Sequence, residues 1–243
     1  VPSRVFLLVF FVSSCLRGES PQIVSLQKIW DHGPHNAFTD LIRYRNQWFC
    51  TFRESLGHVG GDGRIRILTS PDGDRWTSAA LLAETGVDLR DPKLSITPDG
   101  RLMLLAGGSV YEGSTLRGRQ SRVAFSADGR RWTRPRKILA PGDWLWRLTW
   151  HKGRAYGISY LGSGTDPRHG VLYSTADGLR YTRITDPQVP GVSEVTVRFL
   201  PDSTMVALAR REIEPRHGWI GTSRPPYTEW KWNEIPYRLG GPN

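Results

Sequence analysis

Three short stretches of the chain have nearly the same sequence: TSPDGDRWT at 69–77, FSADGRRWT at 125–133 and STADGLRYT at 174–182. Each of them places an aromatic residue three positions after a glycine. In a tight turn, Asp accepts hydrogen bonds from nearby backbone N–H groups and Gly adopts the positive φ that such a turn requires. We therefore expect three equivalent turns, each with an aromatic ring folded back between sheets.

The turns lie in phase with a longer repeat. From residue 36 onward apolar and polar residues alternate, as they do in β-strands. Pairs of hairpins, such as TDLIRYRNQWFCTFRE followed by RIRILTSPDGDRWTSAALL, form four-stranded antiparallel units that repeat about every 50 residues. The first strands of these units begin near Asp40, Asp91, Trp146 and Glu194. A repeat of this kind predicts an all-β fold, a β-propeller with four visible blades.

The length of the chain is compatible with one domain. The sequence has 243 residues, with 26 Gly and 17 Pro spread along it, which favours many short strands joined by turns. We assign residues 21–243 to the propeller. Because the sequence stops at RLGGPN, which looks like the entry to a fifth blade, we expect either a four-bladed propeller or a larger one truncated at its C-terminus.

Residues 1–20 have the pattern of an export signal. Arg4 precedes an apolar stretch that is too short to span a bilayer but fits the hydrophobic region of a signal peptide. The segment VSSC also resembles a lipoprotein box, with Cys15 as the lipid-bearing residue. We expect an exported protein that is free in the periplasm, secreted, or anchored to a membrane only through Cys15. Cys50, in QWFCTF, is expected to be a buried core thiol.

The chain carries a formal net charge of +10. Such a charge favours solubility or an acidic partner, for example a substrate carboxylate. The Arg residues are scattered and lack the runs of nucleic-acid-binding proteins, so we expect no nucleic-acid partner and a monomeric chain. There is no phosphate-binding loop and no dinucleotide motif, so no cofactor is expected. His32 and His35 lack a third ligand, so no metal site is predicted.

The propeller topology indicates where a site would lie. The starts of the first strands and the ends of the second strands share one face near the axis, where ligands commonly bind. The repeated turns lie at the opposite end. Candidate catalytic acids on the axial face are Asp40, Glu54, Asp91 and Glu194. Candidate substrate-binding residues are Arg53, His58, Arg90, Trp146, Arg147 and Arg210.

These residue types suit glycan chemistry. An Arg guanidinium binds a carboxylate through two parallel hydrogen bonds, and paired acids act as nucleophile and proton donor on a glycoside. The alternative is an axial network of ion pairs that merely neutralises itself. In that case Arg53 and Glu54 close one blade, Asp40 and Asp91 cap backbone groups, and Trp146 belongs to the core. His58 either covers a ligand from its glycine-rich loop or is simply exposed.

The turns resemble the Asp box of sialidases, with one residue fewer than its usual spacing. HNAFTDLIRYRNQWFCTFRES, LRDPKLSITPDGRLML and GTSRPPYTEWKW are also similar to bacterial exported members of the sialidase-like superfamily. The resemblance implies a six-bladed propeller and exo-acting removal of sialic acid. It implies an Arg clamp for the sugar carboxylate, a Tyr–Glu nucleophile and an Asp acid/base.

The family pattern is only partly present. NAFTD stands where the family has Arg-Ile-Pro, so Arg53, Arg147 and Arg210 would have to form a different clamp. Glu194 matches the Glu partner, and Asp40 or Asp91 the acid. The resulting hypothesis is a glycoside hydrolase acting on terminal acidic sugars. The alternatives are a non-catalytic carbohydrate-binding propeller, a protein-interaction propeller, and a fragment whose open edges prevent stable folding.

Overall fold

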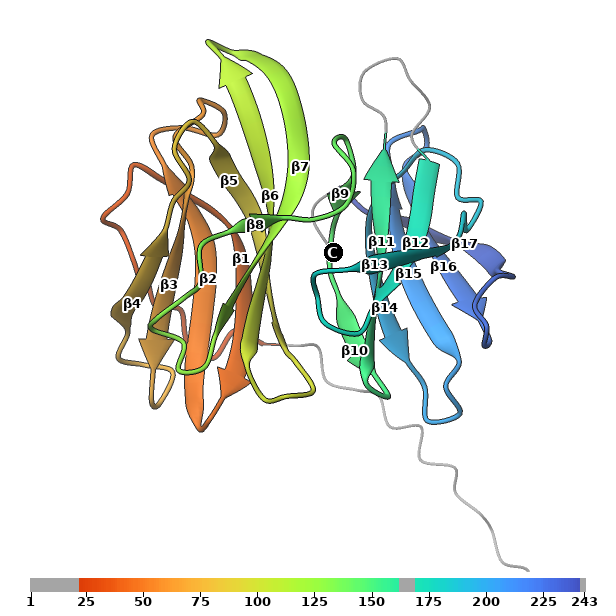
Figure 1. The fold of residues 1–243 in the computed structure, drawn as a ribbon, viewed down its shortest axis with the longest axis horizontal. Helices are drawn as coiled ribbons and strands as arrows, with labels where there is room; N and C mark the ends of the chain where they lie inside the picture. Colours follow the sequence, from red (N-terminus) through yellow and green to blue (C-terminus); the bar gives the residue numbers. More distant parts are fainter. Residues whose placement is uncertain (1–21, 162–168, 241–243) are drawn as a thin grey trace, which may run out of the picture.

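The computed structural model describes residues 22–161 and 169–240, which form β-strands joined by turns (Figure 1). The strands build four antiparallel blades that follow one another along the chain. The predicted leader and Cys15 lie outside the described residues. Within the described part of the chain, no helix has the length and apolar character needed to cross a membrane.

The first two blades contain four strands each. Blade 1 consists of β1 (His35–Tyr44), β2 (Gln47–Ser55), β3 (Arg64–Ser70) and β4 (Thr77–Leu82). Blade 2 consists of β5 (Asp88–Ile96), β6 (Leu102–Glu112), β7 (Thr115–Ser126) and β8 (Arg136–Lys137). In both blades the strands pair in chain order, so that the first strand lies at one edge and the fourth at the other.

The last two blades follow the same order. Blade 3 consists of β9 (Trp144–Leu145), β10 (Thr149–His151), β11 (Arg154–Leu161), β12 (His169–Thr175) and β13 (Tyr181–Thr185). Blade 4 consists of β14 (Val192–Phe199), β15 (Met205–Arg211), β16 (His217–Ser223) and β17 (Lys231–Arg238). In blade 3 the first strand is divided, because β9 and β10 both pair with β11. The all-β propeller with four blades is confirmed, whereas the six-blade expectation stays a prediction.

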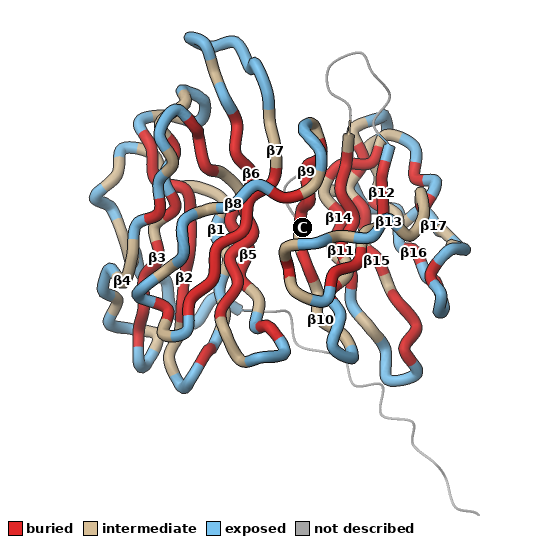
Figure 2. Tube along the Cα trace, in the orientation of Figure 1, coloured by how far each residue is buried: buried red, intermediate tan, exposed pale blue. Residues whose placement is uncertain are grey.

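Three apolar cores join neighbouring blades. One unites blades 1 and 2 and includes Phe49 and Leu104; a second unites blades 2 and 3 and includes Met103. The third unites blades 3 and 4 around Trp146. Buried residues line the inner strands, whereas most loops are exposed (Figure 2). Each blade is therefore held mainly by burial of apolar surface against the next one.

The three repeated turns, 70–76, 126–132 and 175–181, form as expected, and we call them the acidic turns. In the second, Ser126 Oγ accepts a hydrogen bond from the Gly129 N–H at 2.7 Å, and the Trp132 indole donates to the Gly129 carbonyl at 3.0 Å. Asp128 accepts from two backbone N–H groups, and Gly129 has a φ of 75°. Trp132 packs against the core between blades 1 and 2.

The innermost strand of every blade is interrupted at the same level. In β1, β5 and β14 the register shifts between Ala37 and Asp40, between Arg90 and Lys93, and between Val192 and Val195. In blade 3 the interruption is the segment 146–148 between β9 and β10. A β-bulge inserts one extra residue and redirects the side chains beside it. The four interruptions therefore turn side chains out of the regular alternation near the axis.

A pair of Gly→Ala substitutions separates backbone strain from packing between blades. Gly100 and Gly129 both have positive φ, but a Cβ on Gly100 meets nothing within 4 Å, whereas one on Gly129 overlaps the Phe49 ring of blade 1. We expect Gly100→Ala to lower the free energy of unfolding by about 1 kcal/mol through strain alone. Gly129→Ala should cost about 1–3 kcal/mol more. If chemical denaturation showed that both variants lose the same free energy of unfolding, the packing of this turn against blade 1 would be contradicted.

Candidate functional site

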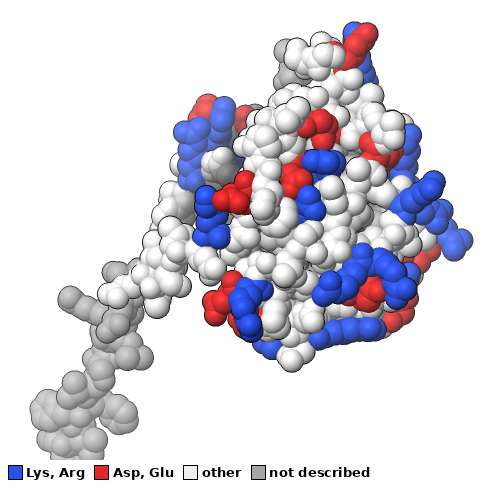
Figure 3. All heavy atoms as spheres, turned by 90° about the vertical axis from the view of Figure 1, so that its left-hand side faces the viewer, with Lys and Arg blue, Asp and Glu red and all other residues white. Residues whose placement is uncertain are grey.

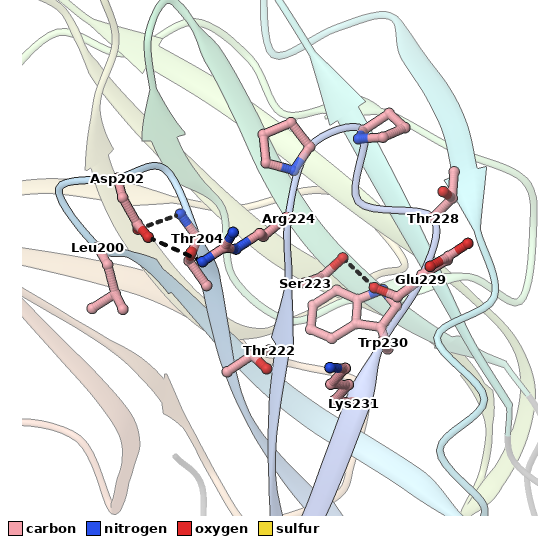
Figure 4. Close-up of a pocket in the computed structure, with 12 residues that line it drawn as sticks. Leu200, Asp202, Thr204, Thr222, Ser223, Arg224, Thr228, Glu229, Trp230 and Lys231 are labelled. Atoms are coloured by element: carbon pink, nitrogen blue, oxygen red, sulfur yellow. Dashed lines mark hydrogen bonds and ion pairs between the residues drawn. The ribbon is translucent and has the colours of Figure 1, made fainter.

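Two cavities of the structure are candidate ligand sites. The larger, of about 950 Å³, lies where β16 turns into β17 in blade 4 (Figure 4). Its walls include Trp230 and the exposed ion pair between Arg224 and Asp202, whose closest nitrogen and oxygen atoms are 3.9 Å apart. The Asp202 carboxylate accepts a hydrogen bond from the backbone N–H of Thr204 at 2.9 Å, which lowers the pKa of Asp202. Asp202 is therefore not prepared to carry a proton near neutral pH.

The smaller cavity, of about 490 Å³, lies at the axial face, at the end of the blades opposite the acidic turns. We call it the axial pocket. It is lined by Phe38, His58, Val59, Arg90, Asp91, Ser109, Tyr111, Leu116, Arg119, Trp144, Tyr160, Glu194 and Arg210. All four blades contribute to this lining, which combines two acids with three arginines and several aromatic rings. The axial pocket is the stronger candidate because its chemistry is concentrated and its titratable groups are perturbed.

The strand interruptions place the key side chains of the axial pocket. Phe38 and Asp91 are bulge residues of β1 and β5, and both have positive φ, of 63° and 50°. Glu194 lies in the corresponding bulge of β14. Pro92 follows Asp91 and cannot donate to a strand ladder, which suits a bulge. The acids thus enter the pocket because the ladder breaks at their positions.

Burial shapes the chemistry of Asp91. Desolvation raises the pKa of this carboxyl, and the nearby charges of Arg90 and Lys93 and a hydrogen bond from the Trp144 indole oppose that rise. A raised pKa favours a protonated carboxyl at a higher pH than for an exposed Asp. Asp91 can therefore serve as a proton donor.

Glu194 has a related but distinct environment. Desolvation raises its pKa, and the negative charge of Asp91 adds to the rise, whereas a hydrogen bond from Arg210 opposes it. The Arg210 guanidinium lies 3.0 Å from Glu194 and also 3.0 Å from Glu212. Because the cation stabilises the ionised form, Glu194 is better suited than Asp91 to act as a carboxylate.

Two further arginines of the pocket are held against aromatic rings. The Arg119 guanidinium lies 5.2 Å from the centre of the Tyr160 ring and 5.7 Å from that of Trp144. Arg90 lies 5.2 Å from the Phe38 ring and donates to the His58 carbonyl at 3.2 Å. Such contacts orient the planar guanidinium. Arg90, Arg119 and Arg210 therefore supply three positioned cations.

The loop residue His58 lies at the rim. Its ring centre is 5.5 Å from that of His35 and 5.4 Å from that of Phe38. Desolvation lowers the pKa of His58, and the charges of Arg90 and His35 lower it further. His58 is thus expected to be neutral near pH 7, as a hydrogen-bonding group and not as a fourth cation.

The structure brings five of the ten candidate residues to the axial pocket: His58, Arg90, Asp91, Glu194 and Arg210. Arg53, a predicted substrate-binding residue, is fully buried and does not line the axial pocket. Its guanidinium makes two hydrogen bonds to Asp88, at 2.7 and 2.9 Å, and both side chains are 0% exposed. Arg53 therefore joins blades 1 and 2 as half of a closed ion pair.

Asp40 and Arg147 also form a structural pair. Their side chains approach to 2.8 Å between blades 1 and 3, and Asp40 accepts the backbone N–H of Leu94 in blade 2 at 2.7 Å. For these two residues the structure therefore matches the alternative given by the sequence, an ion pair near the axis that neutralises itself. Trp146, only 1% exposed, belongs to the core between blades 3 and 4 and does not line the pocket.

Glu54 lies on the outer face of blade 1. It accepts hydrogen bonds from the Trp30 indole at 3.0 Å and from Arg66 at 2.9 Å, and Arg64 lies 3.3 Å away. These donors lower the pKa of Glu54 in spite of its desolvation. Glu54 thus fastens the segment before β1 to the sheet. On this side of the molecule, acidic and basic side chains are interspersed (Figure 3).

Several lining residues were not predicted, among them Phe38, Tyr111, Arg119 and Trp144. Trp144 precedes Trp146 by two positions and would share its face in a regular strand, so alternation could not distinguish them. Pro92 was the available signal for the bulge beside Asp91. Cys50, as predicted, is a buried thiol, and burial raises its pKa to about 11. In residues 22–161 and 169–240, no group of three His, Cys, Asp or Glu side chains is placed to hold a metal ion.

The fold is shared with solved structures of known proteins. A Dyadobacter fermentans protein of unknown function is 18% identical, with a TM-score of 0.76 over 84% of this chain and 70% of that one. Penicillium chrysogenum α-L-arabinanase, complexed with arabinobiose, is 15% identical, with a TM-score of 0.68 over 86% and 69%. Trypanosoma rangeli sialidase, in complex with sialic acid, is 12% identical, with a TM-score of 0.63 over 82% and 37%. No protein-family model and no curated protein sequence matches the chain.

Removing the charge of Arg53 should destabilise the protein strongly. Arg53→Met removes both hydrogen bonds to the buried Asp88 carboxylate and leaves it only the Arg90 guanidinium at 3.8 Å, which costs about 3–5 kcal/mol. The matched control is Arg64→Met, because Arg64 is 49% exposed beside Glu54 and its loss should cost less than about 1 kcal/mol. Urea denaturation of both variants measures the difference. Similar small losses would show that the Arg53–Asp88 pair does not join the blades.

Asp91→Asn should change stability in a pH-dependent manner. The pKa of Asp91 is raised above its unfolded value of 3.8, so the folded state binds this proton more tightly than the unfolded chain does. The ionised carboxyl therefore costs stability above the folded pKa, and Asp91→Asn should raise the melting temperature at pH 7 but not at pH 3.

The acidic turn at 175–181 provides a control in which the pKa shift, and therefore the expected change in melting temperature, has the opposite sign. Hydrogen bonds lower the pKa of Asp177 to about 2, so its stabilisation is complete above pH 3.8 and is lost as the pH falls through 2. Asp177→Asn should therefore lower the melting temperature at pH 7, and the loss should shrink towards pH 2. A destabilised Asp91→Asn at pH 7 would contradict the burial of that carboxyl.

Proposed function

We propose that this protein is a glycoside hydrolase that acts on terminal acidic sugars of glycans. The observation that carries the proposal is the axial pocket, where Asp91 and Glu194, from blades 2 and 4, face one cavity beside three positioned arginines. Desolvation raises the pKa of both acids, and only Glu194 is hydrogen-bonded to an arginine of the pocket. Two carboxyl groups with different environments are what acid-assisted glycoside cleavage requires.

In the proposed reaction Asp91 is the general acid. It donates its proton to the glycosidic oxygen as the bond to the sugar carbon breaks, and positive charge develops on the sugar ring. Glu194, ionised beside Arg210, stabilises that charge, and it either activates water or attacks the sugar carbon. Hydrolysis then needs Asp91 protonated and Glu194 ionised. The rate should fall at low pH as Glu194 gains a proton and at high pH as Asp91 loses one.

The three arginines support an acidic sugar. Arg90, Arg119 and Arg210 outnumber the two acids of the pocket, and a guanidinium binds a carboxylate in bidentate fashion. This set replaces the combination of Arg53, Arg147 and Arg210 that the sequence suggested. Of the sugars bound by the similar folds, sialic acid carries a carboxylate and arabinobiose does not, and the arginines favour the former class.

A non-catalytic carbohydrate-binding propeller is the second candidate. The ion pair between Glu194 and Arg210, at 3.0 Å, favours it because a carboxylate engaged by a cation is a weaker base. The same pocket would then hold an acidic sugar without cleaving it. We also propose export, on the basis of the pattern in residues 1–20, with Cys15 as a lipid attachment site.

The test uses the purified chain with a panel of fluorogenic glycosides, including sialosides and neutral arabinosides. We expect cleavage of an acidic glycoside that Asp91→Asn and Glu194→Gln lower at least 100-fold. Arg119→Met should raise KM for that substrate about tenfold with little change in kcat. Asp74→Asn, at an exposed position of the first acidic turn, is the control that should retain activity.

Calorimetry with the free sugars separates the two candidates. Sugar binding without turnover would support the carbohydrate-binding propeller and refute the hydrolase. A folded protein that neither binds nor cleaves any sugar of the panel would refute both.

A further inference from the structure

A buried lysine follows the pocket residue Asp91 by two positions in β5, in a place where this residue is uncommon. Lys93 in β5 is 4% exposed, and lysine is almost never so buried unless it is paired. Its ammonium lies 4.3 Å from the centre of the Trp146 ring and donates to the Pro92 carbonyl at 3.3 Å. The bulge at Asp91 and Pro92 thus positions an acid in the pocket and a buried cation within three residues.

All four blades surround this ammonium with charged groups. The charges that act on Lys93 are those of Asp40 in β1, Asp91 in β5, Arg147 in the segment 146–148 and Glu194 in β14. Asp40 and Arg147 are already bound to each other at 2.8 Å. Of these charges that of Asp40 acts most strongly on Lys93, whereas Asp91 and Glu194 are the two that belong to acids of the pocket.

The physical consequence follows from Coulomb's law in a poorly solvated site. A cation that cannot move to solvent favours the ionised forms of neighbouring carboxyl groups. The charge of Lys93 acts on both Asp91 and Glu194, and in each case it opposes the effect of burial. Without it, burial would be opposed chiefly by Arg90 at Asp91 and by Arg210 at Glu194, and both carboxyl groups would bind protons more tightly.

We propose that Lys93 is a positioning residue of the axial pocket: its ammonium, seated on Trp146, allows one of the Asp91–Glu194 carboxyl pair to be ionised while the other keeps its proton. This assignment rests on the proposed function for its catalytic meaning, but its electrostatic content can be measured without any substrate. The opposing view is that Lys93 only packs against Trp146. Replacing Lys93 by an uncharged side chain of similar length distinguishes the electrostatic role from the packing role.

The experiment measures the titration of individual carboxyl groups by NMR in ¹³C- and ¹⁵N-labelled protein. The side-chain carboxyl carbons of Asp91 and Glu194 are assigned through Asp91→Asn and Glu194→Gln. Lys93→Met should raise both titration midpoints, by about one pH unit. Lys93→Arg, which keeps the charge, should leave them close to the wild-type values. Lys137→Met, at an exposed position of β8, is the matched control and should change neither.

A measurement on the unaltered protein covers the case in which Lys93→Met does not fold. The ¹⁵N resonance of the Lys93 ammonium should shift at the same pH values at which the two carboxyl groups titrate, because coupling between charges is reciprocal. Unchanged midpoints in a folded Lys93→Met, or an ammonium resonance without these inflections, would overturn the proposal.

Activity separates this proposal from the proposed function. If the protein is a hydrolase, Lys93→Met should shift the acidic limb of its pH–rate profile upward by the amount that NMR shows for Glu194. If the protein cleaves no glycoside but the midpoints still shift, the hydrolase is refuted and the role of Lys93 in setting the charge of the pocket stands.

Discussion

Four antiparallel blades can share an axis only if their innermost strands approach one another closely, and a regular strand leaves little freedom in where its side chains point. The interruptions in β1, β5, β14 and between β9 and β10 relax that constraint at one level of the axis. Each adds a residue to its ladder and redirects the neighbouring side chains. The axial pocket depends on these breaks, because two of them carry Asp91 and Glu194.

The charges around the axis divide into two kinds. Arg53 with Asp88, and Asp40 with Arg147, are ion pairs that join different blades. Asp91 and Glu194, in contrast, open into a cavity and have pKa values raised by burial. Ion pairs thus join the blades, whereas Asp91 and Glu194 line the cavity that a ligand would enter.

Local signals in the sequence were sufficient for the fold. Gly73, Gly129 and Gly178 each mark a turn whose hydrogen bonds lie within seven residues, and the distances between the turns reveal the blade. The site was harder to predict because its contacts are long-range. Arg53 follows the pattern of a strand end, but its partner Asp88 lies in the next blade. Trp144 lines the axial pocket because the alternation of side chains along the strand is interrupted beside it. No local sequence pattern predicts that interruption.

The central claim is that sugars bind in the axial pocket and not in the larger cavity of blade 4 or at the acidic turns. Indole N–H resonances provide a reporter for each place: Trp144 lines the axial pocket, Trp230 lines the larger cavity, and Trp132 closes an acidic turn. The direct measurement is a ¹H–¹⁵N NMR titration of the labelled protein with sialic acid. The account predicts that the Trp144 resonance shifts while those of Trp132 and Trp230 do not. A shift of Trp230 or Trp132 with Trp144 unchanged would contradict it.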